Sequence, residues 1–78
     1  MTEKEYLEFK NLISMGDELN FYYKNDEYWI SHIQDKSFLS RTKDSYAQEF
    51  CGHKELFEHA TIESKKISEV YSELRQLK

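Results

Sequence analysis

Residues 18–42 read ELNFYYKNDEYWISHIQDKSFLSRT, and this stretch decides the fold. Large apolar side chains recur at every second position, which is the period of a β-strand. The polar pairs Asn25-Asp26 and Asp35-Lys36 interrupt the alternation and predict two tight turns. The segment is therefore expected to form a three-stranded antiparallel meander. Its predicted cross-strand pairs are Tyr23 with Tyr28, Tyr22 with Trp29, Phe21 with Ile30, Ile33 with Phe38, and His32 with Leu39.

The alternation assigns the side chains of the meander to two faces. One face is expected to carry the core, with His32 at its edge. Its apolar members are Leu19, Phe21, Tyr23, Tyr28, Ile30 and Leu39. The opposite face collects Tyr22, Trp29, Ile33 and Phe38. Left bare, these four side chains would form an apolar patch at or above the size that soluble monomers usually expose.

An N-terminal helix is predicted from Thr2 to about Met15. Thr2 and Glu5 have the spacing of a capping box, and Gly16 stands where a helix commonly ends in a left-handed residue. The apolar stripe of this helix consists of Tyr6, Phe9, Leu12 and Ile13.

Helical spacing returns after the polar stretch 43–48. A short helix is expected over Lys54–Ala60, and a longer one from about Lys65 to the end of the chain. The apolar stripe of the longer helix consists of Ile67, Val70, Tyr71, Leu74 and Leu77. A helix, a meander and two further helices make an α+β fold, because the strands are consecutive rather than alternating with helices.

The composition predicts one small domain spanning residues 1–78. Twelve aromatic residues are too many for a disordered chain, and 78 residues support only one core. The single cysteine cannot form an intrachain disulfide, which favours a reducing, cytoplasmic location. No apolar run approaches the roughly 20 residues of a membrane span, so no membrane association is expected. The net charge of −4 lacks the basic excess of a phosphate-binding domain and disfavours nucleic acid as a partner.

Two segments resemble a family of short, uncharacterised bacterial proteins. Residues 16–30 are similar to its hairpin pattern, G-x-E-hydrophobic-x-F-x-Y followed by Y-x-I. Residues 50–71 resemble its tail, F-x-s-x-x-E-L followed by a-x-I-x-G-K-x-L-x-E-I-W. This chain departs from the pattern at Ser64, where the family commonly has Gly, and at Tyr71, where it often has Trp. The resemblance implies a shared fold and a bacterial source, and it implies no particular activity.

The candidate metal ligands are Cys51, His53 and His59, with Glu55 and Glu63 nearby. However, Cys-x-His is not a recognised zinc spacing, and no second pair of ligands completes a four-ligand site. A solvated helix face is the preferred interpretation, and no cofactor is expected. No third group orients a nucleophile, and the only two glycines form no phosphate-binding loop, so we do not expect an enzyme.

Three interpretations of the face formed by Tyr22, Trp29, Ile33 and Phe38 remain open. First, the face could be core, because a helix covers it or because the third strand is mispaired. Second, a protein partner or second copy could dock on it. Third, single-stranded nucleic acid could stack on it. Residues 17–42 contain five acidic and three basic side chains, which would repel phosphates. The sequence therefore predicts a small non-catalytic interaction or regulatory protein. The alternatives are single-stranded nucleic-acid binding through the same aromatic residues, and metal binding through Cys51, His53 and His59.

Overall fold

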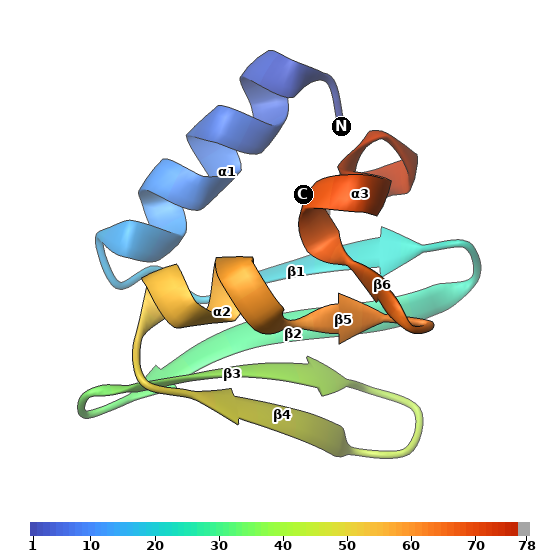
Figure 1. The fold of residues 1–78 in the computed structure, drawn as a ribbon. Coiled ribbons are helices and arrows are strands. Elements are labelled where there is room, and N and C mark those ends of the chain that lie inside the picture. The colour runs from blue at the N-terminus through green and yellow to red at the C-terminus, as the bar shows by residue number, and fades with distance from the viewer. Residues whose placement is uncertain (77–78) are drawn as a thin grey trace.

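The computed structural model describes residues 1–76 and has an α+β fold, as the sequence predicts (Figure 1). Its elements in chain order are α1 (Glu3–Ser14), β1 (Leu19–Tyr23), β2 (Asp26–Ile33), β3 (Lys36–Arg41), β4 (Tyr46–Phe50), α2 (His53–His59), β5 (Thr61–Ile62), β6 (Lys65–Lys66), α3 (Ile67–Val70), a 3-10 turn (Tyr71–Glu73) and β7 (Leu74–Gln76).

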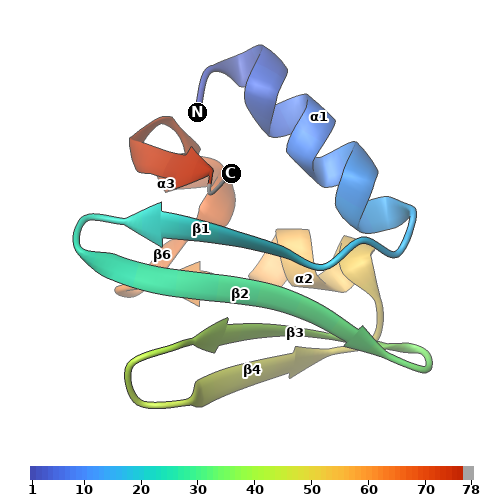
Figure 2. The same ribbon diagram turned by 180° about the vertical axis from the view of Figure 1, so that it is seen from behind.

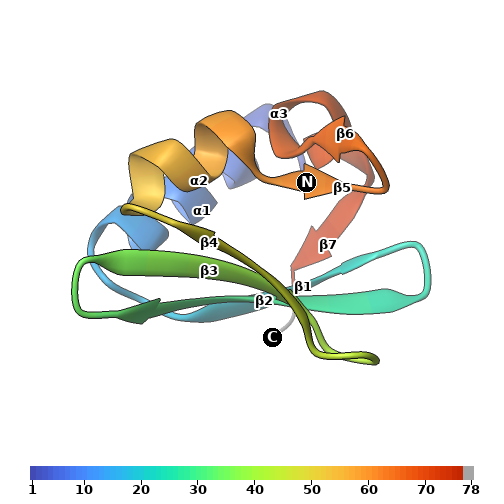
Figure 3. The same ribbon diagram turned by 60° about the horizontal axis from the view of Figure 1, so that its bottom comes forward.

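The main sheet has five antiparallel strands in the order β4-β3-β2-β1-β7, so the predicted three-stranded meander is the centre of a wider sheet. Seen from behind, β2 runs between β1 and β3 (Figure 2). The strands β5 and β6 form a separate hairpin. The helices and this hairpin lie together over one face of the main sheet (Figure 3).

The predicted strand register is wrong by two residues in both hairpins of the meander. The turns fall at Lys24-Asn25 and Gln34-Asp35, one residue earlier than predicted, and their first residues have φ of 55° and 56°. A shift by an even number of residues leaves each side chain on its predicted face, because side-chain direction has a period of two. The observed pairs are Leu19 with Ile30, Asn20 with Trp29, Phe21 with Tyr28, Tyr22 with Glu27, Ile30 with Leu39, Ser31 with Phe38, His32 with Ser37, and Ile33 with Lys36.

The start and the end of α1 are confirmed. Glu5 N–H donates to Thr2 Oγ1 at 3.1 Å, and Thr2 N–H donates to Glu5 Oε1 at 2.8 Å, which completes the capping box. Gly16 follows the helix with φ of 96°, a backbone conformation that side-chain-bearing residues rarely adopt. Both signals are local, so the sequence was sufficient to locate this helix.

The predicted long C-terminal helix is wrong. Residues 65–66 form a strand, the helix α3 has only four residues, and Leu74 begins β7, which pairs with β1. The apolar spacing is nevertheless satisfied, because Ile67, Val70 and Leu74 are all buried. Pairing of β7 with β1 supplies hydrogen bonds to an edge that would otherwise be open. Leu77, the last member of the predicted stripe, lies outside the described residues.

The strand β4 was missed because its sequence, Tyr-Ala-Gln-Glu-Phe, carries no clear apolar alternation. It lies at the edge of the sheet, where Gln48 and Phe50 are half-buried and the other three residues are exposed. Edge strands need little apolar surface, so periodicity gives only a weak signal for them.

The core lies between the sheet and the layer of helices. Phe9 of α1 packs edge to face on Phe21 at 5.7 Å between ring centroids, and Phe21 stacks on Tyr28 at 5.6 Å. Tyr6 of α1 stacks on Tyr71 at 4.5 Å, which joins the first helix to the C-terminal segment. The buried apolar residues are Tyr6, Phe9, Ile13, Phe21, Tyr23, Tyr28, Ile30, Leu39, Leu56, Ala60, Ile62, Ile67, Val70 and Leu74.

Candidate interaction surface

The second face of the main sheet, here called the outer face, is not covered by any helix of the described chain (Figure 3). Covering by a helix, one of the three interpretations of this face, is therefore wrong for residues 1–76. Trp29 is 41 % exposed and Ile33 is 63 % exposed, whereas Tyr22 and Phe38 are half-buried. The four predicted residues lie on this one face, on three adjacent strands.

The three aromatic side chains of the outer face run diagonally across the sheet. Trp29 is paired with Asn20 and Ser40, so Tyr22 and Phe38 are its diagonal neighbours on β1 and β3. Diagonal neighbours on one face lie roughly 7–8 Å apart, within reach of large side chains. These three residues, here called the aromatic band, thus lie on one diagonal across the middle of the sheet.

The charged residues of the outer face have partners within the chain. Arg75 lies over the Tyr22 ring, 5.6 Å from its centroid. Asn20 Nδ2 donates to Glu27 Oε2 at 2.8 Å, and Lys36 forms an ion pair with Glu49. These contacts hold charges around the aromatic band rather than within it, in the arrangement of an apolar centre and a polar rim that is common in protein interfaces.

Two of these rim residues lie on strands that the sequence did not predict. Arg75 lies in β7, where a helix was predicted, and Glu49 lies on β4. Glu27 follows the predicted turn at Asn25-Asp26 and lies two residues before Trp29, so alternation alone places it on the outer face, where it pairs with Tyr22. Pairing of β7 with β1 and of β4 with β3 brings Arg75 and Glu49 to the outer face.

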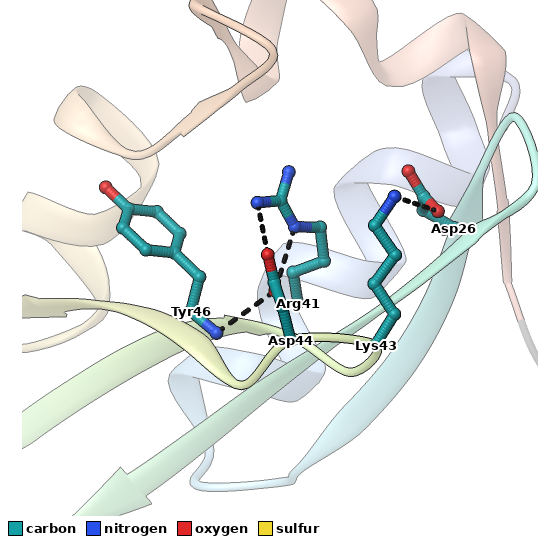
Figure 4. A network of polar contacts seen from close by, with 5 residues as sticks. All are labelled: Asp26, Arg41, Lys43, Asp44 and Tyr46. Atoms are coloured by element: carbon teal, nitrogen blue, oxygen red, sulfur yellow. Dashed lines mark hydrogen bonds and ion pairs between the residues drawn. The ribbon is translucent and has the colours of Figure 1, made fainter.

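An ion-pair network closes one end of the sheet, at the loop between β3 and β4 (Figure 4). Arg41 donates to both carboxylate oxygens of Asp44, at 3.0 and 2.6 Å, and the Tyr46 N–H donates to Asp44 Oδ1 at 3.2 Å. Lys43 reaches Asp26 at 3.3 Å and ties the loop to the start of β2. The Arg41 guanidinium lowers the pKa of Asp44, and the same ion pair raises the pKa of Arg41. The network orders the loop and leaves Asp44 ionised near neutral pH.

A small hollow of about 220 Å³ lies between the sheet and the β5–β6 hairpin. Arg41 and Glu63 line it with opposite charges. Each already has a partner, because Arg41 binds Asp44 and Glu63 pairs with Lys24 at 3.4 Å. A wider groove of about 480 Å³ runs between α1 and α2, with Leu7 and Phe57 among its lining residues.

The candidate metal ligands do not assemble into a site. Among residues 1–76, no group of three or more His, Cys, Asp or Glu side chains could hold a metal ion. Cys51 is exposed, and its backbone N–H, just before the start of α2, donates to Glu55 Oε1 at 3.1 Å. The helix ends at His59, so Glu63 lies in the β5–β6 turn and not on a helical face with Glu55.

Comparisons with known proteins add no relative to this description. No protein-family model matches the chain, and no curated protein or solved structure is significantly similar to it. No helix within the described part of the chain is long and apolar enough to cross a membrane.

Proposed function

We propose that this chain is a non-catalytic protein-interaction or regulatory module that binds its partner through the outer face. The observation that carries the proposal is the position of Trp29, which lies on the central strand and remains 41 % exposed while every described helix packs on the opposite side. Aromatic residues are enriched among the side chains that contribute most to protein binding.

The sheet preorganises the aromatic band for binding. Its backbone is fixed by hydrogen-bonded neighbours on both sides of β2, so little chain entropy is lost when a partner binds. Tyr22 is held further by the Arg75 guanidinium above its ring. A partner that covers Trp29 and Ile33 would remove apolar surface from water at about 25 cal/mol per Å².

The charges of the outer face favour a protein partner over single-stranded nucleic acid. Stacking of bases on aromatic residues is normally accompanied by cationic side chains that follow the phosphates. Here Lys36 is paired with Glu49, and Glu27 adds a negative charge beside Tyr22. The experiment must therefore distinguish protein binding from nucleic-acid binding through the same aromatic residues.

The experiment is a pull-down from native cell extract with the wild type, Trp29→Ala and Tyr46→Ala. Tyr46 is the matched control, because it is also an exposed aromatic residue, at 58 %, but its side chain lies on the other side of the sheet from Trp29. We expect Trp29→Ala alone to lose the captured protein. Identical recovery by all three proteins would contradict the proposal.

Fluorescence anisotropy with labelled oligonucleotides at low salt completes the test. We expect no change in anisotropy up to high protein concentration. Binding that disappears in Trp29→Ala would instead assign the aromatic band to nucleic acid.

A further inference from the structure

We propose that the edge strand β4 binds an extended, uncharged segment of a partner protein, which adds a further strand to the main sheet beside β4. This surface is separate from the aromatic band, so the inference does not rest on the proposed function. Three observations carry it: the direction of the β4 backbone groups, the regularity of the edge, and the pairing of its charges.

The strand β4 ends the sheet on the side of β3, and no other element of the described chain lies beyond it (Figure 1, Figure 2). It has five residues, whereas β7 at the opposite edge has three. Ala47 and Glu49 of β4 are exposed. The longer of the two edge strands is therefore open to a neighbouring chain.

The hydrogen bonds of the sheet show which backbone groups of β4 point outward. In an antiparallel ladder, the residues of a strand turn their N–H and C=O groups alternately toward one neighbour and the other. The Thr42 N–H donates to the Glu27 carbonyl at 3.0 Å, so the even-numbered residues of β3 face β2. The odd-numbered residues of β3 therefore face β4, where their partners are the even-numbered residues. The backbone groups of Ala47 and Glu49 consequently point away from the sheet.

These outward backbone groups have no partner within residues 1–76. Cys51 is the next residue in the same outward row, and its N–H donates to Glu55 Oε1 at 3.1 Å. The backbone groups of Ala47 and Glu49 form no such bond among the described residues. They leave a row of donors and acceptors, spaced two residues apart, that matches the edge of another extended chain. Strand addition to a sheet obtains its affinity from such a row.

The edge lacks the features that usually prevent pairing with another chain, which include proline, bulges and unpaired charges. The sequence has no proline, and β4 pairs with β3 through consecutive residues without a bulge. Glu49, the only charged residue of β4, forms an ion pair with Lys36. Ala47 adds only a methyl group beside the outward backbone. The pairing of Glu49 with Lys36 leaves no charge on β4 to attract a charged segment, so we infer an uncharged one.

Hydrogen exchange followed by NMR tests strand addition, with the uncharged peptide acetyl-Ser-Thr-Val-Thr-Val-Thr-Ser-amide as the probe. In the free protein, the N–H groups of Ala47 and Glu49 should exchange rapidly, whereas that of Gln48 should exchange slowly because it faces β3. Peptide at about ten times its Kd should slow exchange at Ala47 and Glu49 about tenfold and change Gln48 less. The control probe is the same peptide N-methylated on its three central residues, which cannot donate there and should have no effect.

The variant Ala47→Pro removes one outward N–H and no hydrogen bond to β3, and proline is tolerated at such edge positions. It should abolish the slowing at Glu49. Ala47→Thr is the matched control, because it changes the side chain and keeps the N–H, and it should behave as the wild type does. Circular dichroism and the thermal midpoint show whether each variant is folded. If Ala47→Pro does not fold, the comparison of the two peptides on the wild type still decides.

Three outcomes would overturn the proposal. The first is no slowing by the unmodified peptide up to its solubility limit. The second is equal slowing by both peptides, or slowing that persists in Ala47→Pro. The third is slowing that grows with protein concentration in the absence of peptide, which would assign the edge to a second copy of the chain.

Strand addition and the proposed function fail separately. Trp29→Ala leaves the backbone of β4 intact and should bind the peptide as the wild type does. A captured protein that is lost in Trp29→Ala, together with no effect of the peptide, leaves the outer face standing and overturns strand addition. Alternating slowing at Ala47 and Glu49, together with capture that is unchanged in Trp29→Ala, gives the reverse result.

Discussion

The substitution Ser64→Gly is expected to stabilise the protein. Glu63 and Ser64 form the turn between β5 and β6, with φ of 52° and 69°. The left-handed region costs a residue with a side chain about 1–2 kcal/mol. Glycine avoids that cost but loses about 0.5–1 kcal/mol through its greater freedom in the unfolded chain. The midpoints of these two ranges leave a net gain of about 0.75 kcal/mol.

The sign of the predicted change in the free energy of unfolding distinguishes the observed turn from the long C-terminal helix that the sequence suggests. At the start of such a helix, Ser64 would be the N-cap residue, and its replacement by glycine would cost a few tenths of a kcal/mol. Thermal unfolding followed by circular dichroism measures the difference, since a gain of about 0.5–1 kcal/mol raises the midpoint of a domain of this size by about 2–8 °C.

Ser68→Gly provides the matched control. Ser68 is exposed within α3 and has a negative φ, so glycine there should cost about 0.5–1 kcal/mol. A midpoint that falls in Ser64→Gly as it does in Ser68→Gly would refute the reasoning from the turn.

Three further predictions concern the core and the pH dependence of stability. Phe21→Ala should cost about 3–5 kcal/mol by chemical denaturation at low protein concentration, because Phe21 is fully buried, whereas Trp29→Ala should cost about 1–2 kcal/mol. The pKa of Asp44 is lowered from 3.8 in the folded state, so its contribution to stability is present above about pH 4 and is lost as the pH falls below that. Asp44→Asn should therefore make the free energy of unfolding less dependent on pH in the acid range. Burial raises the pKa of Tyr28 above 10.0, so it stabilises the fold below pH 10 and this contribution is lost as the pH rises further. Burial also raises the pKa of Tyr6, so Tyr28→Phe should reduce, and not abolish, the part of the phenolate absorbance titration that lies above pH 10, and an unchanged late phase would contradict the assignment.

The sequence predicted best where the signals were local. The capping residues of α1 and the glycine that follows it lie within a few residues of the backbone groups they satisfy. The short helix was predicted over Lys54–Ala60 and begins one residue earlier, at His53. In both cases, the hydrogen bonds that end the helix belong to the helix itself.

The strand register and the C-terminal segment could not be predicted in the same way. Turns one residue away from the observed ones satisfy the same alternation, because a shift of two residues keeps every side chain on its face. Leu74 is buried whether it lies on a helical stripe or in a strand, so apolar spacing could not distinguish the two. The free edge of β1 decided the outcome, and that edge exists only in the folded sheet.

The candidate site follows the same division. Alternation alone placed Tyr22, Trp29, Ile33 and Phe38 on one face, since side-chain direction along a strand depends only on position. It left open whether that face was covered, because covering depends on where distant helices pack. His32 lies at the edge of the core face, as alternation predicts. Its contacts with Ser37 Oγ at 2.8 Å and with the Asp17 carbonyl at 3.1 Å depend instead on the observed register.

The sequence by itself thus determined the fold class, the first helix and the division of the aromatic residues between two faces, because each follows from a period or a cap within one segment. Only the tertiary structure decided that all helices gather on one side, that β4 and β7 widen the sheet, and that charged residues surround the aromatic band. These features arise from pairing between segments far apart in the chain. The exposure of Trp29, from which the proposed function starts, is therefore a property of the assembled sheet.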